Sequence, residues 1–126
     1  MAEPQIELRD VAKRYEGTAA LEAVSLTVAA GEFVALVGGS GSGKTTLLKT
    51  INGLVRPDAG SVRIAGQEAA GLAPHELRRR IGYVFQEIGL FPHLTVEENI
   101  AITPRLMGWD APRRTARAAE LLELVA

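Results

Sequence analysis

Residues 38–45 combine glycines, a lysine and a threonine at a spacing that suits the binding of a phosphate chain. They read Gly-Gly-Ser-Gly-Ser-Gly-Lys-Thr, so four residues separate Gly38 from Gly43, and Lys44 and Thr45 follow directly. Glycine has no Cβ and tolerates positive φ, so backbone N–H groups can turn inward around an anion. Lys44 can reach the β- and γ-phosphates as a point charge, and the Thr45 hydroxyl can join the octahedral shell of Mg²⁺. The spacing therefore predicts a P-loop that binds a nucleoside triphosphate with Mg²⁺.

The segments on either side of this loop have the character that a P-loop requires. Phe33–Val37 is an apolar run, which predicts a buried parallel strand, and helical periodicity begins at Lys44. The start of that helix would add N–H groups and the positive end of its dipole. A glycine-rich turn with a nearby lysine is the alternative, and the complete spacing between strand and helix argues against it. The predicted nucleotide-binding residues of this segment are Gly38, Gly39, Ser40, Gly41, Ser42, Gly43, Lys44, Thr45 and Thr46. The apolar face of the helix is predicted to contain Leu47, Leu48, Ile51 and Leu54.

Composition limits the chain to one modest hydrophobic core. It has 126 residues, 47% of them hydrophobic, and a formal net charge of −1. This balance gives no electrostatic footprint for nucleic acid. The sequence has no cysteine, which excludes disulfide and thiolate chemistry. The first residues lack the basic start of a signal peptide and no long apolar run follows, so we expect a cytoplasmic chain that reaches the membrane only through a partner.

Alternating apolar and polar residues predict three further strands, at 5–11, 24–28 and 61–66. These strands suggest an antiparallel β subdomain beside the nucleotide-binding core. Another apolar run, Ile81–Phe85, predicts a second buried strand that ends at Gln86. The expected fold is therefore α/β, with a partial P-loop NTPase core and an antiparallel β subdomain.

Three helices are predicted after the P-loop helix. A short one at 74–80 carries three consecutive arginines, which form either a phosphate-binding patch or a solvated helical face. Thr95 and Glu98 fit a capping box at the start of the second, and Pro104 is expected to end or bend it. Asp110 can cap the third. The apolar face of the third helix is predicted to contain Ala118, Leu121, Leu122 and Val125. This face continues to the final residues without a stop signal, so we expect the chain to break off inside the helix, before the end of a domain.

The P-loop residues Gly38–Thr45, Gln86 and the loop at 86–96 together carry a resemblance. Over its whole length the sequence resembles the N-terminal half of the ATP-binding subunit of an ABC transporter. The segments 81–93 and 104–109 are most similar to importers of osmoprotectants such as glycine betaine, choline or carnitine. The resemblance implies a partial nucleotide-binding domain spanning the chain. It also implies a complete protein that hydrolyses ATP with Mg²⁺ to drive solute uptake from the inner face of the membrane.

The resemblance assigns roles to two further residues. Tyr15 stands where the family has an aromatic ring that stacks on adenine, although a half-buried core tyrosine is the alternative. Gln86 stands where the family has a glutamine that contacts Mg²⁺ or the attacking water, whereas without the family it would be an ordinary polar loop residue.

The same resemblance implies partners. Ile88–Trp109 matches the region that receives a helix of the membrane-spanning permease subunit. This gives Leu90, Phe91 and Leu94 a reason to be apolar within a loop, and packing inside their own domain is the alternative. A second copy of the ATP-binding subunit and a separate substrate-binding protein are also implied.

Several features that the family requires do not occur in the 126 residues. These are a signature stretch of the Leu-Ser-Gly-Gly-Gln type, a Walker B strand that ends in acidic residues, and a later switch histidine. The general base and the second Mg²⁺ carboxylate are therefore missing. We expect the chain alone to bind nucleotide weakly at best and to hydrolyse none. Phe33–Val37 is expected to expose apolar edges, so the isolated chain should be marginally stable or prone to aggregate.

The residues alone leave two other classes of function as alternatives. A small P-loop kinase would need arginines in a lid, and a GTPase would need a guanine-reading Asn-Lys-x-Asp motif, which the sequence lacks. A nucleotide-dependent interaction module would bind ATP without a membrane partner.

Overall fold

A long antiparallel hairpin, β1 (Pro4–Tyr15) and β2 (Thr18–Ala29), begins the computed structural model. Its turn holds Glu16 at φ 46° and Gly17 at φ 82°. Positive φ at both positions is typical of a type I′ turn, whose twist matches that of the paired strands. The structure describes residues 3–87 and 89–126, which divide into the units Met1–Tyr83 and Val84–Ala126.

The first unit contains a four-stranded antiparallel sheet. β3 (Ala59–Ile64) pairs with the other edge of β1, and the two-residue β4 (Gln67–Glu68) pairs with β3, so the order is β2-β1-β3-β4. This confirms the predicted antiparallel β subdomain. The first two strands are longer than the alternation at 5–11 and 24–28 indicated, because the pairing continues past irregular positions.

A bulge in β1 explains how Leu8 and Val11 both reach the core. Two residues three positions apart would normally point to opposite faces of a strand. Asp10 has φ 49°, and the register with β2 shifts between Leu8 and Val11. The extra residue reverses the alternation. Leu8 is therefore 1% exposed and Val11 0% exposed.

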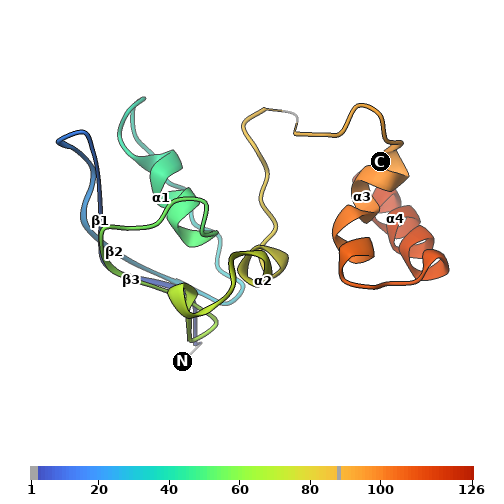
Figure 1. The fold of residues 1–126 in the computed structure, drawn as a ribbon, viewed down its shortest axis with the longest axis horizontal. Coiled ribbons are helices and arrows are strands. Elements are labelled where there is room, and N and C mark those ends of the chain that lie inside the picture. The colour runs from blue at the N-terminus through green and yellow to red at the C-terminus, as the bar shows by residue number, and fades with distance from the viewer. Residues whose placement is uncertain (1–2, 88) are drawn as a thin grey trace. The chain divides into compact units, whose positions relative to one another are not determined.

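Helices cover this sheet and complete the core of the first unit. α1 (Lys44–Ile51) contacts β2 and β3 (Figure 1), and a 3₁₀ turn at Ala69–Gly71 leads to α2 (Pro74–Arg79). The buried core consists of Leu8, Val11, Leu21, Leu47, Ile51, Val62, Ile64 and Leu77. The predicted apolar face of α1 was partly wrong: Leu48 and Leu54 are nearly half exposed, because the sheet covers only the side of the helix that carries Leu47 and Ile51.

Two predicted buried strands are not strands in this structure. Across residues 3–87 and 89–126, neither Phe33–Val37 nor Ile81–Phe85 joins a β-ladder. An apolar run indicates that a segment favours burial. A strand also needs a neighbouring strand with which to exchange hydrogen bonds. Phe33 and Val37 are more than nine-tenths exposed, so the expected exposure of apolar surface at this segment is observed.

The second unit consists of an irregular segment followed by two helices in contact, α3 (Val96–Leu106) and α4 (Ala111–Val125). The capping box of α3 is confirmed: Glu98 N donates to Thr95 Oγ1 at 3.1 Å, and Thr95 N donates to Glu98 Oε1 at 3.1 Å. The bond from the Thr95 N–H holds the pKa of the Glu98 carboxyl below its ordinary value. Of the two effects predicted for Pro104, ending or bending the helix, it does not end it. It lies in the last turn, where Met107 N still reaches Thr103 O at 3.0 Å and continues the helical pattern.

The start of α4 is also confirmed, since Arg113 N donates to Asp110 Oδ1 at 2.8 Å. The predicted apolar face is buried only at Ala118, whereas Leu122 is 40% exposed and Val125 is 79% exposed. α3 is shorter than α4 and covers only part of it. Within the described ranges, no helix has both the length and the apolar character needed to cross a bilayer.

Candidate nucleotide-binding site

The glycine-rich loop turns directly into α1. Ser42 N donates to Gly39 O at 3.2 Å, and Leu47 N donates to Gly43 O at 2.9 Å, which is the first hydrogen bond of the helix. Gly41 and Gly43 have φ of 80° and 95°. Gly38 and Gly39 have no positive φ, so the predicted need for left-handed backbone holds for two of the four glycines. A Cβ on Gly38 would lie 2.8 Å from Ser42 Oγ, so the small size of Gly38 leaves room for that side chain.

Gly43 is where the loop meets the sheet most closely. A Cβ on this residue would lie 2.4 Å from the carbonyl oxygen of Ala20 and 3.2 Å from Leu21 Cδ2. Real Cβ atoms do not approach backbone oxygen so closely, and the positive φ adds strain for any side chain. Only glycine therefore allows α1 to begin against β2. At Gly39, by contrast, a Cβ would meet nothing within 4 Å.

The Lys44 side chain folds back over the loop. Its ammonium donates to the carbonyl oxygens of Gly38 and Gly39, the latter at 2.9 Å, and to Ser42 Oγ at 3.2 Å. These acceptors lie at both ends of the loop, so the ammonium ties the ends together. The arrangement places one positive charge at the loop, where a phosphate chain would need it.

The start of α1 lacks the internal capping that α3 and α4 have. Its N-cap is Gly43, which has no side chain, and no acidic residue lies in its first turn. The first N–H groups of a helix have no intrahelical acceptor, and they carry the positive end of the dipole. Thr95 and Asp110 supply oxygens to the other two helices. The amides at Lys44, Thr45 and Thr46 are therefore suited to an external anion.

Tyr15 lies on the same side of the first unit as the loop. It pairs with Thr18 across the hairpin turn, and Ala20, two residues farther along β2, contacts Gly43. Strand geometry places Tyr15 on the order of 10 Å from the loop. The side chain is 47% exposed, which disfavours the alternative of a core tyrosine.

The donors available for Mg²⁺ fit an ion that keeps most of its water. Thr45 is exposed at the helix start, and Gln86 lies in the second unit, in the irregular segment before α3. No group of three or more His, Cys, Asp or Glu side chains suited to a metal occurs among the residues that the structure describes. Mg²⁺ in phosphate sites typically takes few protein ligands together with phosphate oxygens, so one hydroxyl is compatible with it.

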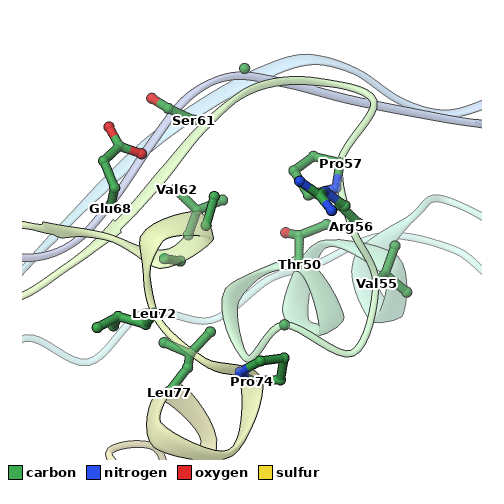
Figure 2. A pocket seen from close by; sticks show the side chains of 14 residues that line it. Thr50, Val55, Arg56, Pro57, Ser61, Val62, Glu68, Leu72, Pro74 and Leu77 are labelled. Atoms are coloured by element: carbon green, nitrogen blue, oxygen red, sulfur yellow. The ribbon is translucent and has the colours of Figure 1, made fainter.

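The first unit also contains a cavity of about 300 Å³ away from the loop (Figure 2). Thr50, Val62 and Leu77 line it from α1, β3 and α2. The Thr50 hydroxyl donates to Leu47 O at 2.6 Å, so it is already satisfied. The cavity lies at the end of α1 opposite the P-loop and contains none of the predicted site residues. It is a gap in the packing between helices and sheet.

A second cavity, of about 340 Å³, lies in the second unit. It is lined by Leu90, Phe91, Pro92, Leu94, Val96, Asn99 and Ile100. Leu90 is 63% exposed and Phe91 is 50% exposed, which argues against packing within their own unit. The predicted loop is confirmed for its described residues, and Ile88 lies outside them.

Asn99 holds this apolar loop in place, and the sequence alone did not reveal it. Its Oδ1 accepts from Phe91 N at 2.9 Å, and its Nδ2 donates to the carbonyl oxygens of Leu94 at 3.3 Å and Thr95 at 2.9 Å. The available signal was an asparagine one residue beyond a capping box, where a helix former is expected.

A protein-family model described as "ABC transporter" matches residues 21–126. The chain belongs to the ABC transporter family. It is 48% identical over 121 residues to the choline transport ATP-binding protein OpuBA of Bacillus subtilis (strain 168), a match that covers 95% of this chain and 32% of that protein. It is 46% identical over 127 residues to the methionine import ATP-binding protein MetN of Rhizobium johnstonii, covering 98% of this chain and 35% of that protein. The chain thus spans about a third of the length of these relatives.

Solved ABC cassettes share the fold. A dimeric bacterial ABC transporter cassette aligns with a TM-score of 0.83 and 37% identity, over 94% of this chain and 56% of the other. A dimeric ATP-binding cassette in a post-hydrolysis state with ADP and Pi aligns with the same TM-score and 36% identity, over the same shares of the two chains. The expected α/β class with an antiparallel sheet is confirmed.

The close approach at Gly43 generates a prediction. We expect Gly43→Ala to lower the free energy of unfolding of the first unit by about 1–3 kcal/mol, because its Cβ meets the Ala20 carbonyl and its φ is positive. Gly39→Ala is the matched control and should change it by less than about 0.5 kcal/mol. Chemical denaturation followed through amide signals of the first unit measures both. Equal effects of the two variants would contradict the proposed contact.

Proposed function

We propose that this chain is the nucleotide-binding part of the ATP-binding subunit of an ABC importer. The observation that carries the proposal is the Lys44 ammonium bound across the glycine loop at an uncapped helix start. In this proposal residues 1–126 form part of one nucleotide-binding domain, which contains both structural units. A small kinase and a GTPase are disfavoured by the family.

Each predicted site residue has a role in this proposal. The loop residues Gly38–Gly43 offer backbone N–H groups to the β- and γ-phosphates of ATP, and Lys44 exchanges its carbonyl contacts for phosphate oxygens. Thr45 donates its hydroxyl oxygen to Mg²⁺, which bridges the phosphates, and Thr46 reaches the α-phosphate. Tyr15 stacks on adenine, and Gln86 completes the metal or water contacts.

Hydrolysis requires more than this chain contains. Phosphoryl transfer depends on an oriented water and on a metal held from both sides. The 126 residues supply the cradle, Lys44, Thr45 and Gln86, without a Walker B acid or a signature stretch. We propose that the chain alone holds ATP without turning it over, and that the whole protein hydrolyses ATP to drive import.

The proposed partners follow from the second unit and from the relatives. The apolar loop at 89–94, fixed by Asn99, is the proposed seat for a helix of the membrane-spanning subunit, because Leu90 and Phe91 remain exposed. Two solved cassettes that are similar to this chain are dimeric, which supports a second copy. A separate substrate-binding protein would deliver the solute. The subunit would then lie at the cytoplasmic face of the membrane.

Osmoprotectants are the proposed solutes. The supporting relatives are the choline protein OpuBA and the osmoprotectant import ATP-binding protein OsmV of Salmonella typhimurium, which is 47% identical over 116 residues. The methionine import proteins are only slightly less similar, at 45–46% identity, so methionine is the second candidate. The solute is selected by other subunits. Growth of cells that depend on the complete transporter, with either glycine betaine or methionine as the solute to be imported, distinguishes the two candidates.

Lys44→Ala tests nucleotide binding. We expect the Kd for Mg-ATP to rise at least about tenfold, because a charge-assisted contact to the phosphates is lost. Lys49→Ala, on the same helix and away from the loop, is the matched control and should leave the Kd within about twofold. Calorimetry on the full chain measures both. An unchanged Kd in Lys44→Ala would refute a P-loop role for this segment.

Phe91→Asp tests the partner. We expect at least about tenfold less complex with the membrane-spanning subunit when the two are produced together, because a charge would be buried in an apolar seat. The Kd for Mg-ATP should not change. Leu124→Asp, at an exposed position of α4, is the control. Undiminished assembly of Phe91→Asp would remove the loop from the interface.

A further inference from the structure

The carboxylate of Asp58, 44 residues from Arg14 in sequence, binds the end of β1. Asp58, just before β3, accepts from the Arg14 N–H through Oδ2 at 2.8 Å and from Lys13 Nζ through Oδ1 at 3.3 Å. Its own N–H donates to Ala12 O at 2.8 Å. Three contacts thus fix one residue against the strand that ends at Tyr15.

Asp58 keeps its charge in this position. The Arg14 N–H holds the pKa of the Asp58 carboxyl below its ordinary value, with a smaller contribution from Lys13 and partial opposition from desolvation. A charged carboxylate beside Lys13 restrains the ammonium at the end of a flexible four-carbon stem. The Lys13 side chain is accordingly only 18% exposed.

Lys13 covers one face of the Tyr15 ring. Its Nζ lies 5.2 Å from the ring centroid, within the range of a cation–π contact. This contact places the Lys13 and Tyr15 side chains on one face of the strand. Tyr15 is 47% exposed, so part of the residue stays accessible beside this contact.

We propose that Lys13, held by Asp58, is a positioning residue for Tyr15 and orients its partly exposed ring for the stacking of an adenine base. The inference rests on the proposed function, since it assigns the exposed part of the ring to the base of ATP. A ring that is already restrained loses less conformational freedom on stacking than a free one. Lys13 itself contacts neither the base nor the phosphates.

The proposal separates base binding from phosphate binding. Lys13→Met keeps the apolar stem and removes the charge, so we expect it to raise the Kd for Mg-ATP about two- to fivefold, the range of an exposed cation–π contact. The Kd for inorganic tripolyphosphate, which has no base, should not change. In a Tyr15→Ala background, Lys13→Met should have no further effect on Mg-ATP. Asp58→Asn should reproduce part of the loss.

Calorimetry on the full chain with Mg-ATP and with tripolyphosphate performs this test. Arg9→Met is the matched control, because Arg9 is a cation on the same strand that pairs with Glu7 and not with Tyr15. Lys13→Arg should restore Mg-ATP binding, which distinguishes a positioning charge from general damage to the strand.

Three results would overturn the proposal. One is an unchanged Kd for Mg-ATP in Lys13→Met, and another is an equal loss for tripolyphosphate, which would make Lys13 a phosphate contact. A third is an unchanged Kd for Mg-ATP in Tyr15→Ala. If Lys44→Ala still weakens both ligands, the proposed function survives each of these. If Lys44→Ala weakens neither, the proposed function itself fails.

Discussion

The contact between Gly43 and the carbonyl of Ala20 is the constraint on which the candidate site depends. It fixes Gly43, the N-cap residue of α1, against β2 at a distance that no side chain permits. The loop before α1 is thereby held near the end of the hairpin that carries Tyr15. In the proposed function, the glycine-rich loop and the Tyr15 ring bind one ATP molecule, and this backbone approach joins the elements that carry them.

Much of the site could be predicted from the sequence because its determinants are local. The Gly-x-x-x-x-Gly-Lys-Thr spacing names the phosphate residues, and the capping box at Thr95 names the start of α3 without knowledge of the fold. In each case the atoms that interact lie within a few positions of one another.

The rest depends on atoms that are distant in sequence. Phe33–Val37 has the composition of a strand, but pairing requires a neighbour that composition cannot supply. The bulge at Asp10 reverses an alternation that the residues alone would continue. Asp58 lies 44 residues from the Arg14 amide that it accepts from, and only the pairing of β3 with β1 brings them together. The sequence could also predict that Gly43 is needed for its freedom of φ. Its steric contact with Ala20 exists only in the folded chain.

The central claim is that the amides at the start of α1 bind a triphosphate. Its most direct test is a titration of the full chain with Mg-ATP, followed through its backbone amide NMR signals. The account predicts saturable shifts at Gly41, Gly43, Lys44 and Thr45, with the signals of α4 unmoved. Unshifted signals at these four residues in a folded sample would contradict it, even if ATP bound elsewhere on the chain.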